Sequence, residues 1–267
     1  MVFRMSKLAY FESFNRQHEK EISRIFNGAT QFSSAEPLFE KPLTILCFTN
    51  RSGSNLLAEY LRITRNFAGL REQLNHDIVK KAADKTGVAT FPDYVTDLAR
   101  DSIDDAKSFG FKASWNQLLM LLHWNIPAMF SGLNVIHIER KDIVAQAVSY
   151  SIANQTKQWK STIKKEAAQP EYDFSDILKR LDNAGFGNKM IRQICSVYEL
   201  KHISVIYEDL VADPVMTLAR LHKETGLPLQ QFNIGARALE KQAGHINQEF
   251  STRFKQEFIE NCNATAP

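Results

Sequence analysis

Residues 43–60 read LTILCFTNRSGSNLLAEY, and the rest of the chain is organised around this stretch. Its first six residues, 43–48, are apolar and β-prone, which is typical of a buried strand. Residues 49–55 are small, polar and cationic, and they include one glycine, Gly53. From Leu56 onward, apolar residues recur at the spacing of a helix. The stretch therefore predicts a strand, a tight polar loop and a helix in succession.

This arrangement is suited to binding an anion. The first N–H groups of a helix have no partners within the helix, and the helix dipole favours negative charge there. Gly53 lets the backbone approach a ligand closely, and Arg51 adds a fixed cation with five donors. Ser52, Ser54 and Asn55 can donate further hydrogen bonds. The loop therefore predicts an anion site, while an ordinary strand–turn–helix with a serine N-cap is the alternative.

The loop resembles a phosphate-binding P-loop, but it differs from the version found in nucleoside triphosphatases. That motif reads GxxxxGK[ST]. In this chain no glycine precedes Gly53 at the required spacing, and Ser54 follows it where the motif has lysine. A P-loop-like kinase or NTPase is therefore a disfavoured alternative, also because no clear Mg²⁺-binding Asp follows a predicted strand.

Length and composition are those of an ordinary soluble globular protein. The chain has 267 residues, of which 44% are hydrophobic and 24% charged, with a formal net charge of +3. This charge does not indicate nucleic-acid binding, which usually needs a concentrated basic face. The N-terminus lacks the apolar core of a signal peptide, and no apolar run approaches a transmembrane segment in length. The cysteines have no metal-site spacing, so we expect a cytoplasmic protein with reduced thiols and no metal.

Predicted strands alternate with predicted helices along the chain. Further strands are expected at 109–114, 134–140 and 202–207, and residues 66–76 are read as a loop or a short strand. Helices are expected at 76–107 with a break at 87–92, and at 115–122, 142–153, 173–200 with a possible interruption at 185–187, 214–226 and 248–262. This alternation predicts a three-layer α/β/α, P-loop-like fold with a central parallel sheet.

We expect a single domain over residues 1–267. Residues 1–40 predict an N-terminal helical extension, with scattered apolar positions on one helical face. Residues 154–172 are polar and rich in lysine, which indicates an exposed, mobile segment. Either of these segments offers a surface for a homodimer.

A second group of polar residues follows the strand predicted at 134–140. Arg140 leaves its carboxyl end, and Ser149 lies about two turns into the next helix. Because ligands of open α/β sheets bind at the carboxyl ends of the strands, Arg140 is expected to reach the same crevice as the first loop. Two separated anion sites in one crevice suggest a ligand with two phosphate-like ends. The alternative is a surface Arg–Asp pair and a serine in the interior of a helix.

At this point the sequence resembles a sulfotransferase, and most of all the bacterial carbohydrate family typified by trehalose 2-sulfotransferase. The resemblance rests on the order of four motifs between residue 43 and about residue 260. They are FTNRSGSNLL (48–57), IERKDIVAQAVSYSIANQTKQW (138–159), PEYDF (170–174) and VIYEDLVADPVMTLARL (205–221).

The resemblance implies 3′-phosphoadenosine 5′-phosphosulfate as the sulfuryl donor. Carried over residue by residue, the loop side chains and backbone would hold its 5′-phosphosulfate: Arg51, Ser52, Gly53, Ser54 and Asn55. Arg140 and Ser149 would hold the 3′-phosphate. Common sulfotransferases space this Arg and Ser eight residues apart, a spacing that Lys141 has here, so Lys141 is a second candidate for that role.

The implied reaction is in-line transfer of the sulfuryl group to a hydroxyl of a carbohydrate or glycolipid acceptor. Such a transfer needs positioning and charge stabilisation, and we assign Arg51 to the charge that develops on the leaving 5′-phosphate. The resemblance places the general base just after the first helix, at Glu72, with His76 as the reserve candidate. A non-catalytic nucleotide-binding protein of the same fold is the remaining alternative. Weaker site candidates are Lys112, Trp115, Gln155, Trp159 and Arg253.

Overall fold

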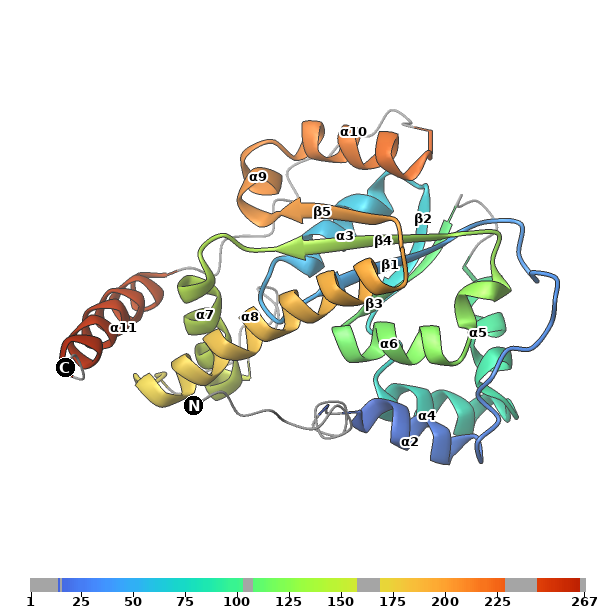
Figure 1. The fold of residues 1–267 in the computed structure, drawn as a ribbon, viewed down its shortest axis with the longest axis horizontal. Coiled ribbons are helices and arrows are strands. Elements are labelled where there is room, and N and C mark those ends of the chain that lie inside the picture. The colour runs from blue at the N-terminus through green and yellow to red at the C-terminus, as the bar shows by residue number, and fades with distance from the viewer. Residues whose placement is uncertain (1–13, 15, 103–107, 158–168, 229–243, 265–267) are drawn as a thin grey trace.

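The computed structural model describes residues 14, 16–102, 108–157, 169–228 and 244–264. Its centre is a five-stranded parallel sheet with the strand order β2-β3-β1-β4-β5 (Figure 1). The strands are β1 (Leu43–Phe48), β2 (Phe67–Arg71), β3 (Ser108–Ala113), β4 (Leu133–Glu139) and β5 (His202–Ile206). The predicted central parallel sheet is therefore confirmed, and residues 66–76, for which a loop or a short strand is expected, supply the edge strand β2.

Helices cover both faces of this sheet (Figure 1). One core contains residues of α2, α4, α5, α6 and α8, and the core on the opposite face contains residues of α3, α9 and α10. The elements of the first group are α2 (Gln17–Ile25), α4 (His76–Thr86), α5 (Phe91–Arg100), α6 (Trp115–His123), the short 3₁₀ helix η1 (Ile126–Met129) and α8 (Phe174–Val197). The second group is α3 (Ser54–Ile63), α9 (Tyr207–Ala212) and α10 (Pro214–Thr225). This arrangement confirms the three-layer α/β/α prediction.

The central strand β1 explains why its sequence is a continuous apolar run. Leu43, Ile45 and Cys47 belong to the core on the α8 side, whereas Leu46 belongs to the core on the α3 side. Each of these side chains is fully buried. A strand that is covered on both faces has no polar side to alternate with its apolar one.

Several helices start and stop at residues that the sequence marks clearly. The side chains of Asp142, Asp173 and Asp213 each accept a hydrogen bond from the backbone N–H three residues later, which satisfies a first-turn donor. Pro214 follows Asp213 at the first helical position, and α10 ends at Gly226 in the left-handed conformation. The predicted boundaries of α10 are therefore confirmed.

The expected interruption of the long helix at residues 185–187 was wrong, because α8 is one continuous helix. A glycine in a helix interior costs about 1 kcal/mol relative to alanine, which made a break plausible. Gly187 has a different purpose in the fold. A Cβ atom at Gly187 would lie 2.7 Å from Thr49 Cγ2 and 3.7 Å from Trp115 Cδ1. The glycine therefore lets α8 pack directly against the end of β1.

The remaining helices form a separate cluster beside the main core. α11 (His245–Ala264) packs against α7 (Ile143–Thr156), and residues of α7, α8 and α11 share a small apolar cluster (Figure 1). The segment predicted to be mobile, residues 154–172, begins inside α7, and residues 158–168 lie outside the described part of the chain. None of the helices that the structure describes has the length and apolar character needed to cross a membrane.

Candidate functional site

The carboxyl ends of the five strands lie along one edge of the sheet, because all the strands are parallel. Each end contributes polar or aromatic side chains at or just beyond its last residue. These are the loop 49–55 after β1, Glu72 after β2, Lys112 in β3, Arg140 after β4 and Tyr207 after β5. Open α/β sheets bind their ligands in this position. The structure therefore brings together most of the residues that the sequence singled out.

The loop after β1 turns sharply through two residues in the left-handed backbone region. Arg51 has φ = 65° and Gly53 has φ = 93°. A Cβ atom at Gly53 would lie 2.3 Å from Tyr207 Cδ2, so any larger residue would collide with this ring. Glycine is thus required at position 53 both by the backbone angle and by the neighbouring aromatic side chain.

Helix α3 begins at Ser54, directly after this turn, and no side chain among the described residues caps its N-terminus. Its first N–H groups, at the carboxyl end of β1, therefore have no partner within the helix. Ser52 is fully buried beside them, and its Oγ atom has no hydrogen-bond partner among the described residues. A buried hydroxyl without a partner is costly unless a ligand or water satisfies it. Donors and dipole together favour an anion at this position.

Two arginines from different strand ends meet at the same place. Arg51 Nε donates a hydrogen bond to Ser149 Oγ of α7 at 3.0 Å. The Arg140 guanidinium lies over the Tyr207 ring, with its Cζ atom 5.0 Å from the ring centroid, and its buried Nε has no hydrogen-bond partner among the described residues. Burial, and secondly the positive charge of Arg140, lower the pKa of Arg51. The Glu208 carboxylate lies 3.9 Å from Arg140 Nε and offsets part of this positive charge, and an anionic ligand between the two guanidinium groups would offset more of it.

Lys141 points away from this pair. Its Nζ atom lies 2.9 Å from Asp209 Oδ1, and more than half of its side chain is exposed. The backbone N–H groups of Lys141 and Asp142 donate to the carboxylate of Glu208, at 3.0 and 3.3 Å. Glu208 therefore holds the turn after β4, and Arg140 rather than Lys141 occupies the crevice.

A third cation connects the loop to the candidate base. Lys112 is 3% exposed, and its Nζ atom donates to Asn55 Oδ1 at 2.5 Å and to Glu72 Oε1 at 2.7 Å. The ammonium group also lies 4.5 Å from the centroid of the Phe48 ring. Glu72 itself is more than half exposed, so its carboxylate is held by Lys112 and remains accessible to a substrate.

The reserve base, His76, has a different environment. It is the first residue of α4, and its Nδ1 atom lies 2.8 Å from Nδ1 of His18 in α2. Its Nε2 atom lies 3.8 Å from a carboxylate oxygen of Asp77. Burial, and then the charge of His76, lower the pKa of His18. His76 is therefore engaged by the helices outside the crevice, whereas Glu72 contacts Lys112 inside it.

Of the weaker candidates, Trp115 lies beside the crevice, and its ring packs edge to face against Phe186 with centroids 5.7 Å apart. Gln155 instead ties the end of α7 to the backbone of Glu171. Arg253 lies over the Tyr172 ring at 3.9 Å, within the cluster of α7, α8 and α11. Trp159 lies outside the described residues.

Sequence reasoning missed Tyr207 and Gln146. Tyr207 follows β5 directly, so its position at a strand end was a usable signal. Gln146 Nε2 donates to Thr49 Oγ1 at 2.9 Å and to the carbonyl oxygen of Asn50 at 2.8 Å. It precedes Ser149 by three residues, the spacing that places two side chains on the same helix face. A search for partners of Ser149 on that face would have found it.

The chain matches the Stf0 sulphotransferase family over residues 44–257. No curated protein sequence matches it significantly. Among solved structures it is similar to mouse sulfotransferase SULT7A1 complexed with PAP, with 14% identity and a TM-score of 0.46, over 74% of this chain and 66% of the mouse chain. It is also similar to the sulfotransferase domain of the Synechococcus PCC 7002 olefin synthase, with 13% identity and a TM-score of 0.48, over 84% and 91% of the two chains. A further similar structure is sulfotransferase STF1 from Mycobacterium tuberculosis H37Rv, with 12% identity and a TM-score of 0.46, over 88% and 75%.

Proposed function

The chain belongs to the Stf0 sulphotransferase family, and from that premise we propose that it moves the sulfuryl group of 3′-phosphoadenosine 5′-phosphosulfate to a hydroxyl of a carbohydrate or glycolipid. The observation that carries this proposal is the convergence of Arg51 and Arg140 from two strand ends on one crevice. A nucleotide with phosphate groups at both its 5′ and 3′ positions would satisfy both cations. The carbohydrate class of the acceptor rests on the sequence resemblance.

The residues at the start of α3 fit the 5′ end of this donor. A phosphosulfate at the helix N-terminus would accept from the first-turn N–H groups, beginning at Ser54, and from the unpartnered Ser52 hydroxyl. Because Gly53 has no side chain, its backbone can approach the ligand closely, and the Tyr207 ring can pack directly against it. Asn55 faces the same region through its contact with Lys112.

Arg140 and Ser149 would bind the 3′-phosphate. The buried Arg140 Nε has no hydrogen-bond partner among the described residues, and the Glu208 carboxylate lies 3.9 Å away, so a phosphate oxygen could accept a direct hydrogen bond from this N–H. Ser149 accepts a hydrogen bond from Arg51 Nε, which supports a position for it close to both proposed anion subsites. The donor, when bound, supplies a sulfuryl group on a good leaving group. Arg51 is positioned to stabilise the negative charge that grows on the leaving phosphate oxygen as the S–O bond breaks.

Glu72 is our assignment for the general base. The acceptor oxygen forms the new S–O bond, and its proton passes to the Glu72 carboxylate, which balances the reaction. Lys112 holds one carboxylate oxygen of Glu72 and thereby orients the group toward the crevice. Lys112 also contacts Asn55 of the anion loop, so it joins the base to the donor site. The Trp115 and Phe186 rings at the rim provide an apolar surface on which an acceptor can rest.

Two measurements test the proposal. Isothermal titration calorimetry with 3′-phosphoadenosine 5′-phosphate should show binding, whereas ATP with Mg²⁺ should bind more weakly. Incubation with ³⁵S-labelled donor and a panel of sugars and glycolipids should transfer label to at least one acceptor. Absence of binding to the bisphosphate would refute the sulfotransferase proposal. Binding without transfer to any acceptor in the panel would favour a non-catalytic nucleotide-binding protein.

A further inference from the structure

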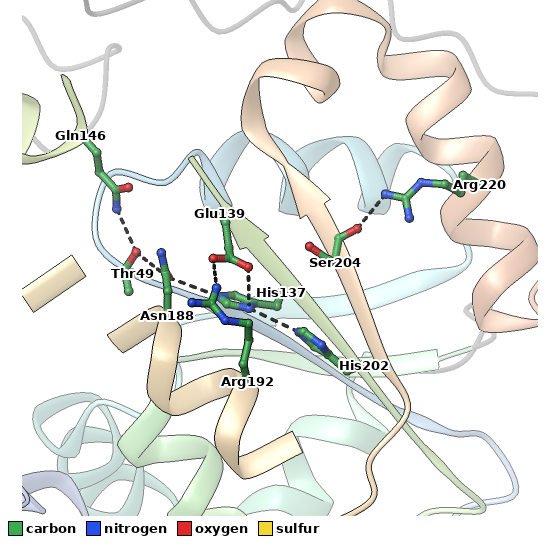
Figure 2. Close-up of polar contacts among 9 residues, drawn as sticks. All are labelled: Thr49, His137, Glu139, Gln146, Asn188, Arg192, His202, Ser204 and Arg220. Carbon is green, nitrogen blue, oxygen red and sulfur yellow. Dashed lines mark hydrogen bonds and ion pairs between the residues drawn. The ribbon is translucent and has the colours of Figure 1, made fainter. Parts of the chain in front are cut away.

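Asn188 of α8 lies at the centre of a buried polar network behind the anion loop (Figure 2). Its Oδ1 atom accepts a hydrogen bond from Thr49 Oγ1 at 3.2 Å and lies 3.2 Å from His137 Nε2. Asn188 is 5% exposed and His137 is fully buried. Three elements that are distant in sequence, the end of β1, the strand β4 and the helix α8, are therefore joined through one amide oxygen.

The hydrogen-bond directions in this network are determined by Asn188. Because an amide oxygen only accepts, the hydrogen of His137 must be on Nε2. The lone pair of His137 Nδ1 then accepts from His202 Nε2 of β5, 3.4 Å away. Glu139 also approaches Nδ1, but its carboxylate is paired with Arg192 of α8. His137 thus acts as a neutral donor toward Asn188, with its second nitrogen occupied by His202.

The network acts on the backbone of the anion loop through Thr49. Gln146 of α7 donates to Thr49 Oγ1 and also to the carbonyl oxygen of Asn50, at 2.9 and 2.8 Å (Figure 2). The next residue, Arg51, has φ = 65°, a conformation that an L-residue other than glycine adopts only at an energetic cost. Gln146 of α7 therefore holds the Asn50 carbonyl, and the Thr49 side chain is held from both α7 and α8.

The close approach of α8 makes this contact possible. The Cα of Gly187 packs against Thr49 so tightly that a Cβ atom would lie 2.7 Å from Thr49 Cγ2. A continuous helix that carries a glycine beside the loop and an asparagine one residue later is suited to holding Thr49 in one rotamer. Gly187, at the expected helix break, thus contributes to the same contact between α8 and Thr49.

We propose that Asn188 and His137 are positioning residues for Arg51: with Gln146 they hold Thr49 and the Asn50 peptide so that Arg51 keeps its left-handed backbone and faces the anion site. This inference rests on the role of Arg51 in the proposed function. Neither Asn188 nor His137 is placed to touch the substrate. Both act through the hydroxyl of Thr49, and their loss should affect the rate of transfer more than the folding of the domain.

The test compares three variants of the full-length protein at pH 8. Asn188→Leu removes the acceptor oxygen, Asn188→Asp keeps one, and Ile194→Ala perturbs the buried face of the same helix without touching Thr49. We expect Asn188→Leu to lower kcat about 10- to 100-fold. Its dissociation constant for 3′-phosphoadenosine 5′-phosphate should rise by a smaller factor than kcat falls, because Arg51 is displaced but the other donors of the site remain. Asn188→Asp should restore most of kcat, and Ile194→Ala should change the thermal midpoint without this loss of kcat.

Equal kcat values for Asn188→Leu and Ile194→Ala, at matched loss of stability, would overturn the inference. A crystal structure of ligand-free Asn188→Leu gives a readout that does not depend on the reaction. We expect the φ angle of Arg51 to become negative in this variant and to stay positive in Asn188→Asp. If the wild-type protein transfers no sulfate, the proposed function fails, and the φ angle of Arg51 alone then decides: a positive value in Asn188→Leu refutes the positioning role, and a negative value supports it.

Discussion

Arg51 Nε donates to Ser149 Oγ at 3.0 Å, so the anion loop after β1 and the helix after β4 touch across the crevice. The two residues are separated by almost a hundred positions in the chain, yet the proposed function has both of them bind one nucleotide. The contact connects a residue proposed for the 5′-phosphosulfate with one proposed for the 3′-phosphate. It also makes the two arginines and this serine the first targets for mutagenesis.

Arg51→Ala should remove most of the sulfate-transfer activity. Loss of one donor to the charge that develops in a transition state typically lowers kcat by about 10²- to 10³-fold. Arg51→Lys keeps the charge but not the fork of donors, so partial activity should remain. Turnover of labelled donor measures both effects, with Arg100→Ala, an exposed arginine at the end of α5, as the control. Unchanged turnover in Arg51→Ala would refute the assigned role.

The roles of Arg140 and Lys141 can be distinguished by comparing ligands with and without a 3′-phosphate. Calorimetry should compare 3′-phosphoadenosine 5′-phosphate with adenosine 5′-monophosphate, which lacks that group. Arg140→Ala should weaken binding of the bisphosphate about 10- to 100-fold, the value of a lost charge-assisted hydrogen bond, and leave the monophosphate nearly unaffected. Lys141→Ala should change neither affinity by more than about 3-fold, because the Lys141 ammonium is paired with Asp209 at an exposed position. The reverse result would assign the 3′-phosphate to Lys141.

Glu72→Gln should lower kcat by about 10²- to 10⁴-fold, the usual contribution of a general base. The amide is nearly isosteric and can still contact Lys112, so the affinity for 3′-phosphoadenosine 5′-phosphate should stay close to that of the wild type. His76→Gln serves as the comparison, since His76 contacts His18 outside the crevice. A large loss of kcat in His76→Gln together with an active Glu72→Gln would exchange the two assignments.

The fold could be predicted for those elements whose burial or capping leaves a recognisable pattern within their own residues. β1 is buried on both faces and therefore reads as an apolar run, and Asp213–Pro214 marks a helix start by local chemistry. The edge strand β2 was ambiguous because it is short and irregular: Leu70 has φ = 50°, and the pairing with β3 shifts its register between Gly69 and Arg71. Neither the positive φ angle nor the register shift can be recognised from the five residues of β2.

The candidate site divides in the same way. The anion loop is contiguous, so its residues could be named from spacing, and Arg140 could be named from its place after a strand. Asn188 lies in the middle of a long helix, and nothing local distinguishes it from its neighbours. Its importance arises only from the contacts with Thr49 and His137, which depend on how α8 crosses the sheet. Gly187 was misread for the same reason.

The histidine at the base of the network should make stability depend on pH. Burial lowers the pKa of His137 from its ordinary value of 6.5 to about 4, and the Glu139 carboxylate and the hydrogen bond with Asn188 only partly oppose this effect. The other ionisable groups that face it are His202 of β5 and Arg192 of α8, and both disfavour a further positive charge on His137. Folded His137 therefore stays neutral under conditions in which the unfolded chain already binds a proton.

Because the folded pKa lies below the unfolded one, the contribution of His137 is complete above pH 6.5 and is lost progressively as the pH falls toward 4. Between pH 6.5 and 5 this loss should amount to about 1.5 kcal/mol of unfolding free energy. Urea denaturation of the wild type and His137→Gln across this range measures it, because the variant cannot take up the proton. The exposed His245→Gln is the matched control and should retain the wild-type slope. Parallel pH profiles for the wild type and His137→Gln would show that His137 titrates normally and that its neutral, donating state is not maintained by the fold.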